Sequence, residues 1–358
     1  MTFIVGCIKD NEIILICDSV ETRIGLKPTK GKTNSIFIDL TSFQEKGEID
    51  TNSIPLESAN KIYKISENCI AAYSGEVRNG ESLIEQLKYL CEKEQSLIET
   101  IPSYFEQWHI QNNELVVGII EGNNRYLIGY YPGQAVKIHN GKKDYCAVYL
   151  GKMTPQTSQI TRYLFENFWP LNAKHFMICL ISLIRNNFYL QNGINKGVGG
   201  FFNGAILSKS GLQWNDDTLY VLYSVKNFEN GDRFSSGVLN RNGFCFIISN
   251  SFRKVVSKTN LSTEEEQEVK KLFDRTTQNI DYKYLVFMSY DQSNMAIIDT
   301  EYNYSHLLEY QIQDRQIYFS FSKEFLDTLK FKPNRELFSG FSLSANFISN
   351  TGEYLQKP

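Results

Sequence analysis

The first twenty residues alternate short apolar runs with a polar turn, which is the pattern of two paired strands. Apolar residues dominate positions 3–8, polar residues occupy 9–11, and apolar residues resume over 13–17. Runs this short predict strands buried on both faces, and the Asp-Asn turn predicts that they pair as an antiparallel hairpin. A second hairpin is predicted from 61–65 and 69–73, which flank a polar turn at 66–68.

The segment between these hairpins has a different composition. Residues 24–57 carry Gly, Pro, Lys, Thr, Ser and acidic residues, and only 36–38 has the character of a strand. We therefore expect an insertion loop there.

After residue 75 the apolar spacing changes to that of a helix, with Leu83, Ile84, Leu87, Leu90 and Cys91 on one stripe. Strands and helices then alternate in groups, which favours sheets covered by helical layers up to about residue 224. The expected strands are 115–120, 125–130, 135–139, 146–150, 204–207 and 219–223, and the expected helices are about 156–168 and 173–189.

A polar stretch containing glycine and serine, 227–237, is interpreted as a linker. Beyond it, Ser262 and Glu265 form a capping box before a helix expected over about 263–275. Strands are expected at 244–248, 284–288, 295–298 and 317–321. The chain is thus expected to divide into a domain over 1–225, with its insertion at about 24–57, and a mixed α/β extension of unknown function over 238–358.

Composition narrows the classes of function. The chain has 358 residues, 42% of them apolar, and a formal charge of −3, without a basic block interleaved with aromatics, so nucleic acid is not an expected partner. No run approaches the roughly 20 apolar residues of a bilayer helix, and the start lacks the marks of a secretory signal, so we expect no membrane partner and a cytoplasmic location.

Seven cysteines, mostly within apolar runs, are expected to be reduced core residues. No CxxC motif occurs and the four histidines have no ligand-like spacing, so neither a metal nor another cofactor is expected.

Several short motifs occur in a meaningful order. The first hairpin ends in Cys17-Asp18-Ser19, and the second contains Lys61-Ile62 and ends in Ala72-Tyr73-Ser74-Gly75 before the helical stripe. Gly129-Tyr130-Tyr131 and the Gly199-Gly200 cluster follow. Over residues 2–224 this order resembles the proteasome β subunits, a family of N-terminal-nucleophile hydrolases.

The resemblance implies an α+β fold, a four-layer αββα sandwich, in which the nucleophile is the first residue of the mature chain. Thr2 meets that condition once Met1 is removed. A threonine hydroxyl needs an adjacent base, and the α-amine of Thr2, with a typical pKa of about 7.7–8.0, can serve as that base.

By the same resemblance, Asp18 holds Lys61, and Lys61 is a fixed cation close to the hydroxyl and the amine of Thr2. Such a cation favours the neutral amine and stabilises negative charge that develops on the hydroxyl oxygen. Gly75 offers its backbone N–H to the oxyanion. Family members assemble into rings, which implies a homo-oligomer that acts on a peptide or another amide.

The sequence also departs from the family. Its supporting acid and serine before the glycine pair fall on Asn195 and Val198, and no serine occurs in the turn Leu150-Gly151-Lys152. Two alternatives therefore stay open beside a threonine-type peptidase: a catalytically silent scaffold or binding subunit, and a hydrolase of small amides.

Each residue also has a purely structural interpretation. Thr2 can be an ordinary second residue, Asp18 can cap the corner of the hairpin, Lys61 can be a solvated edge residue, and Gly75 can serve a turn.

Overall fold

The structure is a computed structural model of the chain. Its described residues are 2–24, 53–57, 60–94, 96–107, 112–141, 146–151, 161–162, 165–166, 171–190, 201–226, 233–241, 244–249, 252–256, 263–276, 280–289, 294–301, 303–313, 316–330 and 344–348. The chain forms a mixed α/β fold with several mainly antiparallel sheets and few helices.

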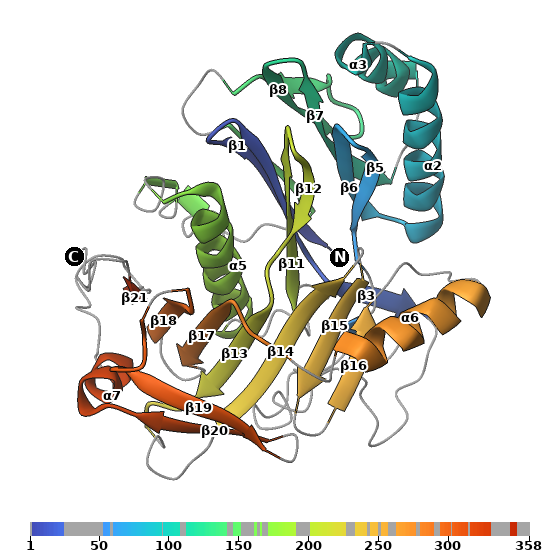
Figure 1. Ribbon diagram of the computed structural model, residues 1–358. Helices are drawn as coiled ribbons and strands as arrows, with labels where there is room; N and C mark the ends of the chain where they lie inside the picture. The colour runs from blue at the N-terminus through green and yellow to red at the C-terminus, as the bar shows by residue number, and fades with distance from the viewer. Residues whose placement is uncertain are drawn as a thin grey trace. The chain divides into compact units, whose positions relative to one another are not determined.

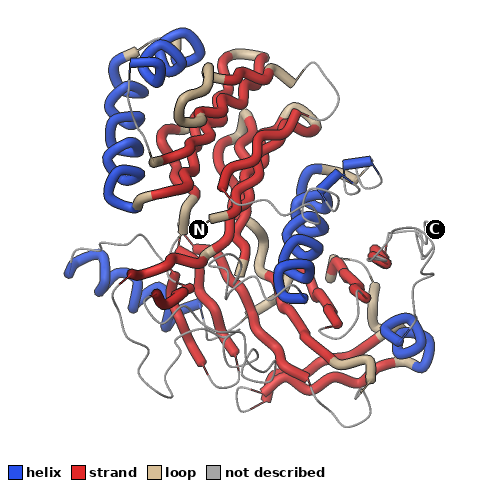
Figure 2. The backbone as a smooth tube through the Cα atoms, turned by 180° about the vertical axis from the view of Figure 1, so that it is seen from behind, coloured by secondary structure: helices blue, strands red, loops and turns tan. Residues whose placement is uncertain are grey.

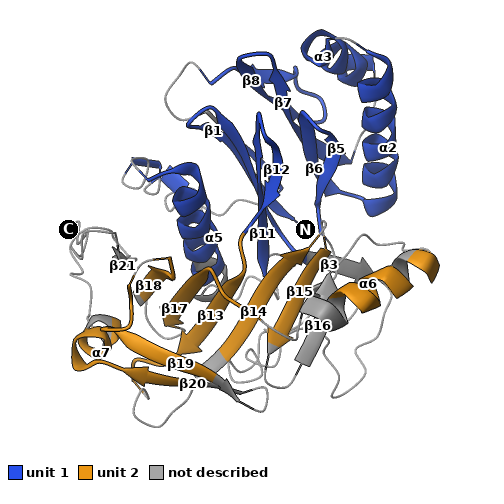
Figure 3. Cartoon of the chain, in the orientation of Figure 1, with its two compact units in different colours: residues 1–215, 257–259 blue, residues 216–256, 260–358 orange. Residues whose placement is uncertain are grey.

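Two compact units make up the chain (Figure 3). Unit 1 comprises Met1–Asn215 with Ser257–Thr259, and unit 2 comprises Asp216–Val256 with Asn260–Pro358. The expected boundary near residue 225 therefore lies too late. Strand β13 (Thr218–Tyr223), which the sequence pattern assigned to the first domain, pairs with β14 and β17 in the sheet of unit 2. Its parallel partner β17 begins only at Tyr284, so local pattern could not assign it.

Unit 1 contains two five-stranded sheets, visible in Figure 1. The first has the order β10-β1-β2-β11-β12 and the second the order β5-β6-β7-β8-β9. The first consists of β1 (Phe3–Lys9), β2 (Glu12–Asp18), β10 (Cys146–Gly151), β11 (Phe202–Ser208) and β12 (Gly211–Trp214). The second consists of β5 (Ile62–Ser66), β6 (Cys69–Gly75), β7 (Asn113–Glu121), β8 (Asn124–Tyr130) and β9 (Lys137–His139).

Both predicted hairpins are confirmed. Strand β1 pairs antiparallel with β2, and Asp10 and Asn11 of the turn have φ values of 52° and 61°, which short Asp and Asn side chains tolerate better than most. Strand β5 pairs antiparallel with β6. The helix predicted from the apolar stripe is confirmed as α2 (Val77–Lys93).

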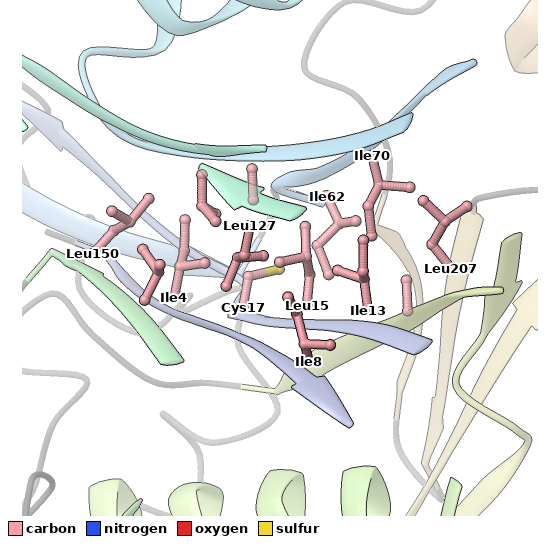
Figure 4. Close-up of a cluster of buried hydrophobic side chains, with 14 of the residues drawn as sticks. Ile4, Ile8, Ile13, Leu15, Cys17, Ile62, Ile70, Leu127, Leu150 and Leu207 are labelled. Carbon is pink, nitrogen blue, oxygen red and sulfur yellow. The ribbon is translucent and has the colours of Figure 1, made fainter. Parts of the chain in front are cut away.

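The two sheets of unit 1 share one apolar core (Figure 4). Alternate residues of β2 point into it, namely Ile13, Leu15 and Cys17, and they meet residues such as Ile70 and Leu127 from the second sheet. Because side chains alternate across a strand, the remaining residues of β2 face the opposite side of the sheet.

Helices cover the outer faces of these sheets. Helices α2 and α3 (Leu97–Gln107) contact the second sheet, and both views place them along it (Figures 1 and 2). Helix α5 (Ala173–Leu190) contacts β2 and β11 of the first sheet. Gly204 permits this approach, because a Cβ there would lie 2.8 Å from Met177 Sδ and 2.9 Å from Ile181 Cδ1 of α5. The helix expected over 173–189 is thus confirmed, whereas most of 156–168 lies outside the described residues.

The segment predicted as an insertion loop, 24–57, follows one strand and ends in another. Strand β3 (Val20–Ile24) pairs antiparallel with β4 (Ser53–Glu57). The loop interpretation is therefore wrong for 53–57, since β4 finds its partner across the insertion, whereas β3 shares only Ile24 with the predicted segment. The possible strand at 36–38 lies outside the described residues.

Unit 2 is built on a seven-stranded mixed sheet of order β16-β15-β14-β13-β17-β18-β21. Besides β13, it consists of β14 (Arg233–Arg241), β15 (Phe244–Ser249), β16 (Phe252–Val256), β17 (Tyr284–Ser289), β18 (Asn294–Asp299) and β21 (Ser344–Ile348). The other elements of this unit are α6 (Thr263–Thr276), the hairpin of β19 (Leu308–Gln313) with β20 (Gln316–Phe321), and α7 (Lys323–Lys330).

Part of the predicted linker is a strand. Residues 227–232 lie outside the described part, but the following residues form β14 between β13 and β15. Gly237 on this strand is needed for packing, because a Cβ at that position would lie 2.1 Å from Tyr282 Oη. The glycine that suggested a linker therefore makes room for a buried tyrosine.

Within the described residues, no helix combines the length and the apolar character that a membrane span requires.

Candidate active site

A buried ion pair is the centre of the candidate site. Asp18, the last residue of β2, is fully buried, and its Oδ1 lies 2.7 Å from the Nζ of Lys61, which is 6% exposed. The same oxygen accepts a hydrogen bond of 3.0 Å from the backbone N–H of Phe3. Because both distances are measured to the same oxygen, their sum is the largest possible separation between Lys61 Nζ and the backbone nitrogen of Phe3.

Thr2 directly precedes that amide and is only 7% exposed. Phe3 begins β1 and pairs with Gly151 at the end of β10. The first peptide of the strand is thus fixed from two sides, by the ladder to β10 and by the Asp18 carboxylate. Charge-assisted bonds of this kind are stronger than neutral ones, so Asp18 anchors both the start of β1 and Lys61.

The backbone before β5 is fixed independently of the ion pair. The side-chain Oδ1 of Asn60 accepts hydrogen bonds from the Ile62 N–H at 3.3 Å and from Asn203 Nδ2 at 3.4 Å. Asn203 lies on β11, directly opposite Cys17 of β2. Asn60 and Asn203 therefore connect the segment that carries Lys61 to the first sheet.

Gly75 lies at the same end of its hairpin as Lys61. Ile62 is opposite Ala72, so Lys61, just before β5, is level with the end of β6. The φ of Gly75 is 121°, and a Cβ there would lie 2.1 Å from the carbonyl oxygen of Asn112. Only glycine fits this position, which agrees with the structural interpretation of Gly75 and leaves its N–H role a prediction.

Gly151 connects the two halves of the site. Its φ is 79°, and a Cβ there would lie 1.9 Å from the carbonyl oxygen of Thr2 and 3.1 Å from Ser74 Oγ. The backbone N–H of Gly151 donates a hydrogen bond to the carboxylate of Glu114. Thr2, Ser74 and Gly151 therefore converge, and all four residues predicted from the sequence gather at one end of the two sheets.

Sequence reasoning missed the placement of Ser74 and Glu114. Ser74 is 7% exposed and lies opposite Glu114 in the pairing of β6 with β7. Ser74 was visible as the residue before Gly75, but only the tertiary structure brings its hydroxyl toward the turn that lacks a serine. Glu114 gave no signal, because it is one acid at the start of a strand.

Cys17 is adjacent to the ion pair but is not a candidate nucleophile. Burial raises the pKa of its thiol to about 12, although the Lys61 ammonium and backbone N–H groups of Lys61 and Asn203 act in the opposite direction. The thiol is therefore protonated at neutral pH, as expected for a core cysteine.

The departures from the family and the expected absence of a metal have different outcomes. Asn195 and Val198, which mark departures from the family, lie outside the described residues. Over the described ranges, no group of three or more His, Cys, Asp or Glu side chains is arranged to hold a metal ion.

No protein-family description matches the sequence, and a search of curated proteins found no relative. Among solved structures, a crystal structure of eukaryotic HslV from Trypanosoma brucei is similar, with a TM-score of 0.38 and 15% sequence identity. The match covers 58% of this chain and 99% of that chain. At this TM-score the likeness assigns neither a family nor an activity.

Proposed function

We propose that unit 1 is a threonine-type N-terminal-nucleophile amidohydrolase, a proteasome-like peptidase, with Thr2 as its nucleophile after removal of Met1. The observation that best supports this proposal is that Asp18 Oδ1 accepts two hydrogen bonds. One comes from the Lys61 ammonium and the other from the backbone amide of Phe3, the residue after Thr2. A lysine that merely served as a solvated edge residue would not be 6% exposed and paired in this way.

In the proposed reaction the Thr2 hydroxyl oxygen attacks a carbonyl carbon, and the Thr2 amine accepts the hydroxyl proton. Lys61 stabilises the negative charge on the attacking oxygen, and Asp18 keeps the ammonium in place. The Gly75 N–H donates to the oxyanion. The amine then passes its proton to the leaving amide nitrogen, and water activated by the same amine hydrolyses the ester.

The proposal extends to the architecture and the setting. The two sheets with helices on their outer faces agree with a four-layer αββα sandwich. We further propose that the protein is cytoplasmic, forms a homo-oligomer and acts on a peptide or another amide. The location rests on the absence of an apolar run of bilayer length and of secretory-signal marks in the sequence, and the other two statements rest on the resemblance of the motifs.

One observation favours the two alternatives, a catalytically silent scaffold and a hydrolase of small amides. Thr2 is only 7% exposed, so little of it is open to a substrate in this conformation. A catalytically silent scaffold would have no need of an open nucleophile, and a small amide would need less space than a polypeptide. Both alternatives are outcomes of the experiment that follows.

Intact-mass measurement after treatment with an epoxyketone probe tests the proposal. We expect loss of Met1 and one covalent adduct, mapped to Thr2. Thr2→Ser should keep the adduct and Thr2→Ala should lose it, while Thr100→Ala on α3 should match the wild type. A chain that retains Met1 has no free threonine amine and overturns the mechanism. Loss of Met1 without an adduct favours the scaffold.

Once the adduct is found, substrate screening separates peptides from small amides. Turnover of peptide amides with loss of activity in Thr2→Ala supports the peptidase. Turnover of small amides alone assigns the protein to the third class.

A further inference from the structure

A pair of cysteines lies on the helix-covered side of the second sheet. Cys69 is the first residue of β6 and is fully buried, and Cys91 lies in the last turn of α2. Cys91 packs against the apolar cluster that contains Cys69, where α2 contacts β6, and each thiol shifts the pKa of the other. The packing of α2 on the second sheet thus brings two cysteines from different elements into one cluster.

The surroundings hold both thiols in place. Leu87 and Leu90 of α2 belong to the same cluster as Cys69. The turn before Cys69 is anchored by Asn68, whose backbone oxygen accepts from the Ile120 N–H at 2.9 Å and whose Nδ2 donates to the Ile120 oxygen at 3.2 Å. The contact therefore links a fixed turn to a packed helix.

The two sulfurs differ in character. A hydrogen bond from the Cys69 thiol lowers the pKa of Cys91, burial opposes this, and the Ser66 hydroxyl adds to the lowering. The pKa of Cys69 is raised by its bond to Cys91 and by burial. Cys91 is also the partly exposed member of the pair, whereas Cys69 is buried, so an oxidant reaches Cys91 first.

We propose that Cys69 and Cys91 form a reversible disulfide on exposure to hydrogen peroxide. The Cys91 thiolate attacks the O–O bond, forms a sulfenic acid and releases hydroxide. The Cys69 sulfur then attacks the Cys91 sulfur and displaces its oxygen as water. In balance, two thiols are oxidised, their two protons are taken up, and one peroxide is reduced to two waters.

The bond has a defined structural consequence. It closes the segment from the start of β6 to the end of α2, which contains Ser74 and Gly75. Covalent closure restricts the unfolded chain and opposes separation of α2 from the sheet. The modification stands independently of the proposed hydrolase activity, because it needs only the two thiols and an oxidant.

Mass spectrometry of the full-length protein tests the proposal. After treatment with hydrogen peroxide under native conditions we expect a loss of about 2 Da from two hydrogen atoms, a cross-linked peptide containing Cys69 and Cys91, and reversal by dithiothreitol. Cys91→Ser should abolish the cross-link. Cys179→Ala, which removes a buried thiol from α5, should leave it unchanged.

A second variant keeps the test decisive if a substitution affects folding. In Cys69→Ala the sulfenic acid has no resolving thiol, so dimedone should label Cys91 at least about tenfold more than in the wild type. Two results would overturn the proposal: wild-type protein in which Cys91 is oxidised but no cross-linked peptide forms, and an equal mass loss in Cys91→Ser.

Discussion

Lys61 Nζ and Asp18 Oδ1 lie 2.7 Å apart within the core of unit 1, although 43 residues separate them in the sequence. The pair joins the segment before β5 in one sheet to the end of β2 in the other. Because Asp18 also accepts from the amide of Phe3, this contact decides where the first residues of the chain lie.

Breaking the buried pair from one side should cost stability. Asp18→Asn leaves the Lys61 ammonium without its counter-charge, and such losses amount to about 3–5 kcal/mol. Lys61→Met should be costly for the same reason, whereas the double variant should lose less than the sum of the two singles. Hydrogen exchange of the β1 and β2 amides measures the effect.

The exposed pair of Lys88 and Glu85 on α2 supplies the control. Lys88→Met should change the free energy of unfolding by no more than about 0.5 kcal/mol. Additive losses in the double variant of Asp18 and Lys61 would contradict the coupling.

Gly75→Ala should distort the end of β6. A φ of 121° is unfavourable for alanine, and its Cβ would lie 2.1 Å from a backbone oxygen that cannot rotate away. We expect a loss of about 2–4 kcal/mol in unfolding free energy, measured by urea denaturation. Gly122→Ala is the matched control: its φ is 57° and the space beside it is open, so about 1 kcal/mol is expected. Equal losses would show that contact with Asn112 is unimportant.

Gly151→Ala should displace Thr2, because the new Cβ would lie 1.9 Å from the Thr2 carbonyl oxygen. If Thr2 is the nucleophile, the rate of adduct formation with the epoxyketone probe should fall about a hundredfold, as a small misplacement of a reacting group can cause. Gly133→Ala, with a φ of 72° and open space, should keep the wild-type rate. A wild-type rate of adduct formation in Gly151→Ala would contradict the assignment of Thr2 as the nucleophile.

Stability should fall at alkaline pH partly because of Cys17. Burial raises its pKa from 9.0 to about 12, so the folded state keeps the proton that the unfolded state releases. The stabilising contribution is complete below about pH 9 and is lost as the pH rises toward 12, with a slope of up to about 1.4 kcal/mol per pH unit. Cys17→Ala should flatten urea midpoints over this range. An unchanged slope would contradict the shift.

Much of unit 1 could be predicted from the sequence because its signals are local. The hairpins around 9–11 and 66–68 depend on apolar runs and polar turns, and α2 depends on the spacing of Leu83, Leu87 and Leu90. The candidate site residues have a different origin: the order of the motifs resembles that of the proteasome β subunits, and this resemblance, not a local pattern, selected Thr2, Asp18, Lys61 and Gly75.

Sequence patterns failed where a partner lay far along the chain or where packing changed the meaning of a residue. Strand β13 was assigned to the wrong unit because its parallel partner, β17, begins only at Tyr284. Gly237 suggested a linker, yet it makes room for Tyr282. Strands β3 and β4 find each other only across the insertion.

By itself, then, the sequence determined the hairpins and the main helices, because each is encoded by neighbours in the chain, and the order of its motifs supplied the resemblance that predicts the charged residues of the candidate site. Only the tertiary structure decided that one oxygen of Asp18 serves both Lys61 and the Phe3 amide, that Gly151 lies against Thr2, and that Cys69 meets Cys91. These contacts arise where separate strands and helices pack, and no local pattern specifies such distances.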